Sequence, residues 1–448
     1  MPQTIHTTIE KIIAGGLGLG RLPDGQTLFV PCVLPGETVR VRLVRHRKQY
    51  SEARLLEVVT PAVERREPPC PCFGTCGGCD LQHADYAAQL RIKEIILREL
   101  LDRGGISGAG EAFPLTVAAS PEEFGYRQRI RLQVAAGGRL GFYRPHSHEV
   151  VAITSCPLAA PGINGVVAGL GRETAARQLL DHTTALECIL SPEDGRVVLL
   201  LHTTRQVRAA DRQHAAALCA AFDLVKGVLF AVPGKSLGPC ITRESGPNGT
   251  TDFSVLAIRF TIPAAIAGQP LTLTVEPGGF SQVNPQQNEG MIATLLAWLA
   301  LSGSEAVLDL FCGMGNFSLP LAVRARSVVG MDLQGAAIRS ARRNAEMNSL
   351  ANCRFEKCGA EEGAQRLAAA GEKFDVVLLD PPRAGCREVI QHPASLGAGR
   401  LAYISCDPAT LTRDLGLLLA QGYAIERMRL FDMFPQTHHL ETMVLLRR

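Results

Sequence analysis

The chain has 448 residues, a formal net charge of +3 and 46% hydrophobic residues, which is enough for two or three domains with full cores. The longest apolar runs fall far short of the roughly 20 residues that a membrane helix needs, and the N-terminus carries no basic head followed by an apolar segment. We therefore expect a cytoplasmic protein with no membrane partner and no obligate protein partner, whose 14 cysteines serve metal, cluster or catalytic chemistry rather than disulfides.

Residues 1–61 predict a small five-stranded β-barrel, because short alternating strands are separated by glycine-rich turns. The stretch Val39–Arg54 carries six cations against one acid, Glu52. Such a run can protect an exposed edge strand, but a barrel with one basic face favours a surface that follows the phosphates of nucleic acid. The segment resembles the TRAM domain of RNA-modifying enzymes, and this resemblance implies RNA binding.

After a linker rich in proline and charge, Pro61–Pro71, the sequence CPCFGTCGGC presents closely spaced thiols in a glycine-rich loop. Such a loop can wrap around one inorganic centre, and the second half of a zinc site, another CxxC or an HxxxH, is missing downstream. We therefore expect an iron–sulfur cluster. Two sets of ligands fit the spacing: Cys70, Cys76 and Cys79 with a distant fourth ligand, or Cys72, Cys76 and Cys79 in the CxxxCxxC spacing of radical S-adenosylmethionine enzymes.

Cys156, in ITSCPL, follows a predicted strand and offers a fourth thiolate for the first of these sets. A cluster with four cysteine ligands has no open iron for a cofactor, so we favour a structural or RNA-positioning cluster on Cys70, Cys76, Cys79 and Cys156. Cys72 would then not be a ligand.

Residues 62–278, which contain these cysteines, predict a mixed α+β domain with a helix over Ala84–Leu101. Strands and glycine turns alternate after this helix. The strand YRQRIRLQV mixes an aromatic ring with guanidinium groups, which suits unstacked RNA bases; a solvated strand face explains it nearly as well.

Residues 279–448 alternate strands with helices, which predicts a doubly wound, Rossmann-like parallel sheet. The run Ala306–Phe317 is an apolar strand, a glycine turn and the start of a helix, and Asp332 ends the next strand, where its carboxylate can bind both ribose hydroxyls of a nucleoside. A third spaced glycine and dehydrogenase chemistry are missing, so S-adenosylmethionine is preferred to NAD as the cofactor.

A second buried strand, FDVVLLDPPR, ends at Asp380, at the edge of the sheet where ligands bind. Asp-Pro-Pro also occurs in amino-methylating enzymes, which generally have an aromatic residue next. Here Arg383 follows. Together with a cysteine at the end of the next strand, this departure favours methylation of carbon.

That cysteine is Cys406 in LAYISCDP, where Asp407 suits a helix N-cap and Pro408 the first helical position. The helix dipole there favours a thiolate, so we expect a nucleophile rather than a small core residue. A thiolate that adds to C6 of uracil activates C5 toward a methyl donor. Of the candidate bases in FPQTHHLETMVLL, Glu441 is preferred, because burial before an apolar run raises its pKa; we take the two histidines as a polar turn.

The motifs PCPCFGTCGGC, FSQVNPQQN, DLFCGMGNFSLPLA, LLDPPRAG, ISCDPATLTRDL and DMFPQTHHLETMVLL stand in the order seen in bacterial 23S rRNA (uracil-5-)-methyltransferases. The resemblance covers nearly the whole chain and implies S-adenosylmethionine-dependent methylation of a 23S rRNA uridine, with Cys406 as nucleophile and Glu441 as base. It also implies a [4Fe–4S] cluster on the four cysteines named above, and a helix 84–101 that packs on the catalytic domain. The implied cofactor and target-base pocket is formed by Gln282, Phe311, Asn316, Asp332 and Asp380.

Two details qualify this resemblance. The family usually makes a further cofactor contact in the segment that matches Glu356–Glu361, often with an Asn or Asp, and Gly359 stands there. Because a stacked base is closed to a thiol, the target must be flipped out, and Phe280 could stack on it or pack in the core.

Other hypotheses remain open from the sequence. The substrate could be a tRNA rather than 23S rRNA. The protein could be a radical S-adenosylmethionine enzyme that needs Cys72, or an amino-group methyltransferase that uses Asp380. Outside enzymes, it could be an RNA-binding or assembly factor with a vestigial pocket.

Overall fold

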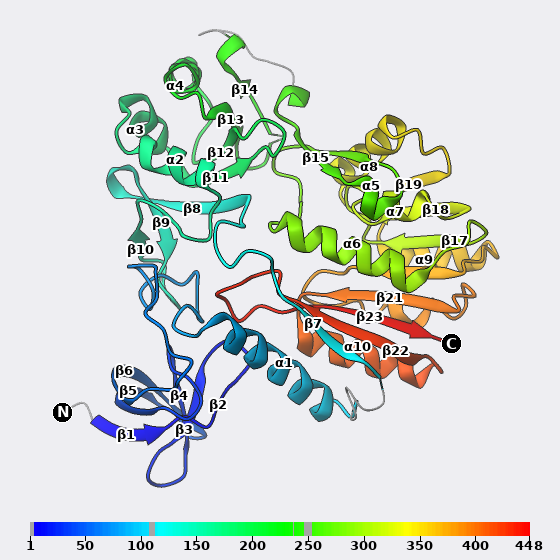
Figure 1. Ribbon diagram of the computed structural model, residues 1–448. Coiled ribbons are helices and arrows are strands. Elements are labelled where there is room, and N and C mark those ends of the chain that lie inside the picture. The colour runs from blue at the N-terminus through cyan, green and yellow to red at the C-terminus, as the bar shows by residue number, and fades with distance from the viewer. Residues whose placement is uncertain (1–3, 107–112, 236, 246–252) are drawn as a thin grey trace.

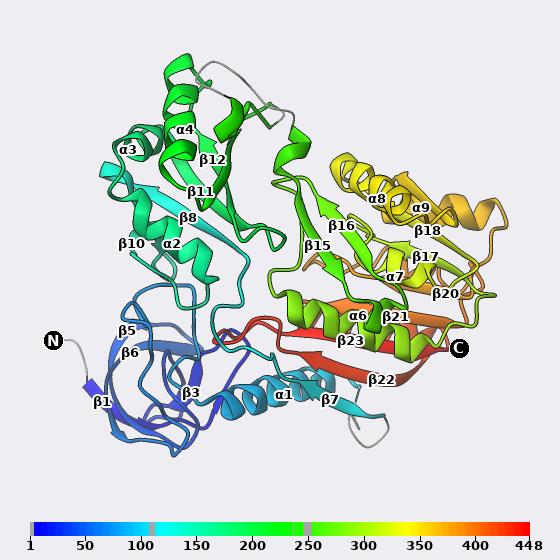
Figure 2. The same cartoon turned by 45° about the horizontal axis from the view of Figure 1, so that its top comes forward.

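The computed structural model describes residues 4–106, 113–235, 237–245 and 253–448, so short pieces of the first two predicted domains lie outside the described residues. The described residues form four sheets, in the order N-terminal barrel, central sheet, a strand pair and a large C-terminal sheet (Figure 1). Figure 2 shows the central sheet above the barrel and the C-terminal sheet to the right of both. No helix among the described residues is long and apolar enough to cross a membrane.

The N-terminal sheet has six strands rather than the predicted five, because the two-residue strand β2 joins it in the order β1-β5-β6-β4-β3-β2. Alternation explains its core: Val39 and Val41 point inward from β5, while the alternate residues Arg40 and Arg42 lie on the other face. The strands are β1 (Thr4–Thr8), β2 (Lys11–Ile12), β3 (Gly18–Arg21), β4 (Thr27–Val30), β5 (Thr38–His46) and β6 (Tyr50–Thr60).

The basic face of this barrel is less uniform than the sequence suggests. Arg40 pairs with Glu57 at 2.7 Å across β5 and β6, and Arg45 lies 3.6 Å from Glu52. Arg42, by contrast, lies directly opposite Arg54 in the same strand pair. Like charges facing each other across strands destabilise a sheet unless an anion lies between or over them.

The central sheet has seven strands, and alternate residues of its strands pack on two different cores. Val197, Leu199 and Leu201 pack toward three helices, whereas Val198 and Leu200 pack toward the C-terminal half. The strands are β10 (Val150–Ala152), β9 (Arg139–Tyr143), β8 (Arg129–Ala135), β11 (Thr183–Leu190), β12 (Val197–Thr203), β13 (Val225–Ala231) and β14 (Cys240–Ile241). The helices are α2 (Pro161–Leu170), α3 (Thr174–Leu180) and α4 (Ala209–Ala221); the separate strand pair is β15 (Ile258–Ile262) and β16 (Leu271–Val275).

The C-terminal sheet is the Rossmann-like part of the molecule, with eight strands in the order β19-β18-β17-β20-β21-β23-β22-β7. The first five run parallel and β23 runs antiparallel between β21 and β22, while β7, from the first third of the chain, pairs with β22 (Figure 1). The strands are β17 (Ala306–Leu310), β18 (Ser327–Asp332), β19 (Cys353–Lys357), β20 (Val376–Leu379), β21 (Arg400–Ser405), β22 (Ala424–Phe431), β23 (Glu441–Arg447) and β7 (Leu115–Ala118). The helices are α6 (Pro285–Leu299), α7 (Ser318–Ala322), α8 (Gly335–Met347), α9 (Ala360–Ala369) and α10 (Pro408–Ala420).

Helix α1 (Tyr86–Arg103) begins two residues later than predicted and packs its apolar face into the same core as the C-terminal sheet and α10 (Figure 1). Its Lys93 is fully buried, donating to the Asp432 carboxylate at 2.5 Å and to the Phe434 carbonyl at 3.0 Å. A buried charge needs such a partner, so this ion pair fixes the helix against the loop between β22 and β23.

We predict that Lys93→Met lowers the free energy of unfolding by about 3–5 kcal/mol, because it leaves the buried Asp432 carboxylate without its cation. The double variant Lys93→Met/Asp432→Leu should recover most of this loss in urea denaturation. Glu94→Gln is the matched control: it removes the partly exposed pair with Arg98 on the same helix and should cost no more than about 0.5 kcal/mol. A Lys93→Met protein as stable as the control would contradict the role of the pair.

Candidate active site

A cavity of about 710 Å³ lies at the carboxyl edge of the C-terminal sheet, where the strand ends of a doubly wound fold meet. Its walls come from the loops after β17, β18, β20 and β21, from residues 275–283, and from the loop between β22 and β23. A cavity of this size can hold a nucleoside-sized ligand and a second ring. Six of the predicted site residues line it: Gln282, Phe311, Asp332, Asp380, Cys406 and Glu441.

Of two further positions singled out from the sequence, Asn316 does not line the cavity and Gly359 does. Asn316 is not among the lining residues, because its side-chain amide exchanges two hydrogen bonds, of 2.8 and 2.9 Å, with Asn288 of α6. Gly359 does line the cavity, at the start of α9, and a side chain added there would meet no atom within 4 Å. The place of the further contact implied by the resemblance is therefore open space.

The turn after β17 and the end of β18 are bonded to each other. The amides of Phe311 and Cys312 donate to the Met331 carbonyl, and Phe311 adopts a positive φ of 75°. Asp332 accepts from the amide of Gly313 at 3.1 Å with one carboxylate oxygen and from Gln334 at 2.7 Å with the other. Each oxygen keeps further acceptor capacity, so the carboxylate is oriented for a hydroxyl-bearing ligand.

Two carboxyl groups near the thiol have raised pKa values. Burial raises the pKa of Glu441, which is 4% exposed, well above its ordinary value; the nearby Asp380 raises it too, and Arg383 opposes the shift. This is the direction that the sequence predicts. Burial, with a smaller effect of Asp309, raises the pKa of Asp380 to about 7. Both groups therefore hold protons more tightly than free carboxylates do.

Cys406 lies in the strand–turn–helix arrangement that the sequence predicts. Asp407 caps α10 by accepting from the amides of Ala409 at 3.1 Å and Thr410 at 2.9 Å. The expected thiolate is wrong for this state, however: burial and the charges of Glu441 and Asp380 raise the thiol's pKa to about 11. The Asp407 carboxylate occupies the free amides at the helix start, so desolvation outweighs the helix dipole.

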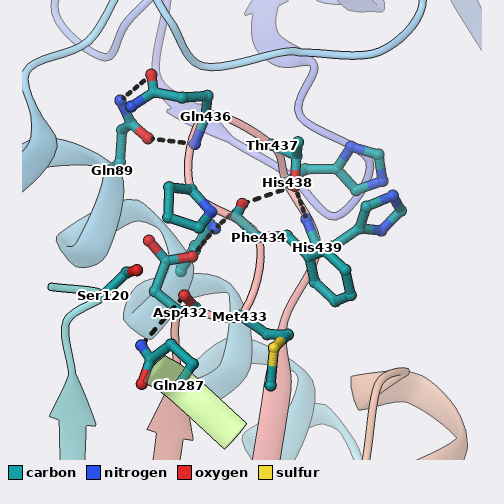
Figure 3. A network of polar contacts seen from close by, with 12 residues as sticks. Gln89, Ser120, Gln287, Asp432, Met433, Phe434, Gln436, Thr437, His438 and His439 are labelled. Atoms are coloured by element: carbon teal, nitrogen blue, oxygen red, sulfur yellow. Dashed lines mark hydrogen bonds and ion pairs between the residues drawn. The ribbon is translucent and has the colours of Figure 1, made fainter. Parts of the chain in front are cut away.

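The loop between β22 and β23 contributes two ring side chains that the sequence prediction missed. Phe434 and His439 both line the cavity, with their ring centroids 5.7 Å apart at 72° (Figure 3). Burial and the neighbouring His438 and Arg383 lower the pKa of His439 to about 4, so its ring is neutral near pH 7. The two histidines are adjacent in THHLE, and no periodicity there indicates which one faces inward. Arg383, noted in the sequence only as a departure, also lines the cavity.

A second cavity, of about 100 Å³, is lined by five cysteines: Cys70, Cys72, Cys76, Cys79 and Cys156. Gln82 and Arg127 line it as well, and Gln82 Nε2 and Arg127 Nε are buried donors with no hydrogen-bond partner among the described residues. Burial raises the pKa of Cys76 to about 11 and that of Cys79 to about 12. In the described part of the chain, no group of three or more His, Cys, Asp or Glu side chains is arranged to hold a metal ion.

Comparison with known proteins gives matches at both ends of the chain and along its whole length. Residues 3–56 match the TRAM domain family, and residues 261–448 match the family described as tRNA (Uracil-5-)-methyltransferase. The chain is 36% identical to the 23S rRNA (uracil(1939)-C(5))-methyltransferase RlmD of Aeromonas salmonicida, over 99% of this chain and 96% of that protein. It is 38% identical to the protein of the same name from Pseudomonas putida, over 98% and 92%.

Among solved structures, the crystal structure of the Pyrococcus abyssi tRNA (uracil-54, C5)-methyltransferase in complex with S-adenosyl-L-homocysteine has the same fold. Its TM-score is 0.75 at 24% identity, with 99% of this chain and all of that chain covered. The chain belongs to the RNA (uracil-5-)-methyltransferase family, with an N-terminal TRAM domain and a C-terminal Rossmann-like methyltransferase domain.

Proposed function

We propose that the protein methylates C5 of a uridine in 23S rRNA, with S-adenosylmethionine as the methyl donor. The observation that carries the proposal is that one cavity holds a thiol, Cys406, and a buried carboxyl group, Glu441, beside the oriented carboxylate of Asp332. The full-length relatives with 36% and 38% identity are named for 23S rRNA, which favours this RNA over the tRNA of the solved structure's name.

S-adenosylmethionine supplies an electrophilic methyl group on a sulfonium. We propose that Asp332 binds its ribose hydroxyls and that Phe311 and Gln282 line its site, as their places in the cavity support. Leu333, an apolar side chain 72% exposed beside Asp332, offers a surface for a ring. Asn316 would act indirectly, by holding the turn after β17 through its pairing with Asn288.

The reacting groups are Cys406 and Glu441. After the thiol loses its proton to solvent, Sγ bonds to C6 of uracil, and the C5–C6 π electrons move toward O4 to give an enolate. C5 then attacks the methyl group, the bond from that methyl to the sulfonium sulfur breaks, and S-adenosylhomocysteine leaves. The Glu441 carboxylate removes the C5 proton, and the released electron pair re-forms C5=C6 and expels the thiolate. A carboxylate with a raised pKa is a stronger base than an exposed one, and Asp380 would lie at the uracil edge.

RNA binding would extend over the barrel. Arg42 and Arg54, which face each other in β5 and β6, gain a favourable partner when a phosphate lies over them. We propose three functional units, residues 1–61, 62–278 and 279–448, with α1 assigned to the last because its apolar face packs in that core.

We predict that Cys406→Ala lowers the methylation rate by about 10⁴-fold or more and forms no adduct with RNA that contains 5-fluorouridine, because no thiolate can reach C6. Glu441→Gln should instead accumulate a covalent, methylated adduct with ordinary RNA, since the C5 proton stays in place. Denaturing gels and peptide mass spectrometry measure both. Cys353→Ser, a partly buried thiol on β19, is the matched control and should methylate normally. Full activity of Cys406→Ala would refute the proposal.

Thiol reactivity should follow the pKa of Cys406. Because that pKa is raised to about 11, the thiolate fraction, and with it the rate of alkylation by iodoacetamide, should rise about tenfold per pH unit from pH 7 to 9. Arg383→Gln should slow alkylation at each pH, since it removes a charge that lowers the pKa; Glu441→Gln should speed it. Peptide mass spectrometry measures the alkylated fraction of Cys406. A wild-type profile that is flat above pH 8 would contradict the shift.

We further propose that the five-cysteine cavity holds a [4Fe–4S] cluster on Cys70, Cys76, Cys79 and Cys156. The donor set fits, because each thiolate of such a cluster binds a different iron, so its ligands stand further apart than those of a single ion. The unpartnered donors Gln82 Nε2 and Arg127 Nε also suit hydrogen bonds to cluster sulfur.

We predict that a serine substitution at any of these four cysteines removes most of the bound iron and sulfide, because thiolate sulfur is the preferred ligand of iron–sulfur clusters. Cys72→Ser, the matched control from the same cavity wall, should retain the full content. Iron and sulfide assays with absorption spectra measure this. The reverse pattern, with Cys72 required and Cys70 and Cys156 dispensable, would favour the radical S-adenosylmethionine hypothesis.

A further inference from the structure

The loop between β22 and β23, residues 432–440, leaves the C-terminal sheet and reaches the segment that follows the cysteine-rich loop (Figure 1). His438 Nδ1 lies 2.6 Å from the Asp80 carboxylate, and the His438 amide donates to the same oxygen at 3.3 Å. In return, the amides of Asp80 and Leu81 donate to the Gln436 carbonyl at 3.1 and 3.0 Å. Asp80 directly follows Cys79, so the two segments are joined beside the cysteine cavity.

Arg127, which lines the cysteine cavity, and its neighbour Tyr126 also contact this loop. The Arg127 guanidinium lies 5.7 Å from the centre of the Phe434 ring, and Arg127 also lines the cysteine cavity. Tyr126 donates its hydroxyl hydrogen to the Pro435 carbonyl at 3.0 Å. The loop therefore contacts the segment that follows Cys79 and, through Tyr126 and Arg127, a stretch of chain that is bonded to the segment after Cys156, because the Arg127 amide donates to the Leu158 carbonyl at 2.9 Å.

The central residue of the loop is held in a conformation that it would not adopt alone. Gln436 is fully buried with a φ of +71°, in the left-handed region that a side chain disfavours. Its backbone amide donates to Gln89 Oε1 at 2.9 Å, and its Oε1 accepts from Gln89 at 2.9 Å (Figure 3). Arg66 donates to the same Oε1 at 3.0 Å. Such a conformation persists only while its surroundings impose it.

The far side of this loop forms part of the active site. Phe434 and His439 line the catalytic cavity, and Glu441 follows the last residue of the loop. The His438 ring centroid lies 4.3 Å from that of His439 (Figure 3). Figure 3 shows the two histidine rings side by side at the end of the network. A shift of His438 would therefore move His439 and the start of β23 with it.

We propose that Asp80 and His438 are positioning residues: their hydrogen bond places Phe434, His439 and Glu441 for catalysis and makes that placement depend on an ordered cysteine loop. The inference rests on the proposed function and adds a role for the cysteine site that needs no redox step. Both side chains are about 30% exposed, so their bond contributes little to global stability. Its effect is on the geometry of the cavity.

The test uses the full-length protein with its iron content verified, in the variants Asp80→Asn, His438→Gln and the double variant. Both changes keep size and some hydrogen-bonding capacity but remove the charge-assisted bond. We expect each single variant to lower kcat by about tenfold to a hundredfold with the KM for RNA nearly unchanged, since small misplacements of catalytic groups are costly. The double variant should be no worse than either single one, because the two residues act as a pair.

Hydrogen exchange of residues 432–440, measured without RNA, gives a readout independent of activity. It should be faster in His438→Gln, and also in Cys156→Ser, which removes a thiol from the other chain segment of the cysteine cavity. Asp194→Asn is the matched control: it breaks the 3.0 Å pair with Lys226 in the central domain and should change neither kcat nor exchange in the loop.

Unchanged kcat in His438→Gln would overturn the positioning role, as would additive losses in the double variant. Loop exchange that stays slow in Cys156→Ser would overturn the dependence on the cysteine loop. Failure of the proposed function can be told apart from failure of this inference. If the proposed function is wrong, the wild-type protein forms no adduct at Cys406 with RNA containing 5-fluorouridine, whatever the hydrogen-exchange results are.

Discussion

The shared burial of Cys406, Asp380 and Glu441 in one cavity is the constraint on which the rest of the site depends. Burial raises the pKa of all three groups; the charge of Asp380 adds to the shift of Glu441, and both carboxyl groups add to that of Cys406. The exposed Arg383 opposes the shifts of Cys406 and Glu441. Burial therefore favours the protonated thiol and the protonated Glu441, so each group must lose its proton before it can act as nucleophile or base.

The topology of the C-terminal sheet brings the thiol and the base together. Strand β23 pairs antiparallel with β21 in a register that sets Thr442 opposite Ser405, so Glu441 and Cys406 stand next to each other at the same edge. The strand β7 and the helix α1, both from the first half of the chain, complete this region from outside. The buried pair between Lys93 and Asp432 and the bond between Asp80 and His438 then anchor the two ends of the loop that precedes Glu441.

Local patterns predicted much of this arrangement. Apolar runs that end in Asp332, Asp380 and Cys406 gave the parallel strands and the side chains at their carboxyl ends, because such strands are buried on both faces. Local patterns do not predict which strands pair when they lie far apart in the sequence. Nothing in the sequence of β7 indicates that it joins the C-terminal sheet. The expectation of a thiolate at Cys406 is wrong because it rests on the helix dipole, which is a local effect. The burial that raises the pKa of the thiol depends on the whole fold. His439 and the pairing of Asn316 with Asn288 were missed for the same reason.

The central claim is that a bond from Cys406 to C6 of the uracil ring forms before the methyl group is transferred. The most direct measurement compares methylation rates of RNA with hydrogen and with deuterium at C6 of the target uridine, under conditions where adduct formation limits the rate. Addition of sulfur turns C6 from trigonal to tetrahedral, so the account predicts that the deuterated RNA reacts faster. Equal rates for the two RNAs, with chemistry shown to be rate-limiting, would contradict it.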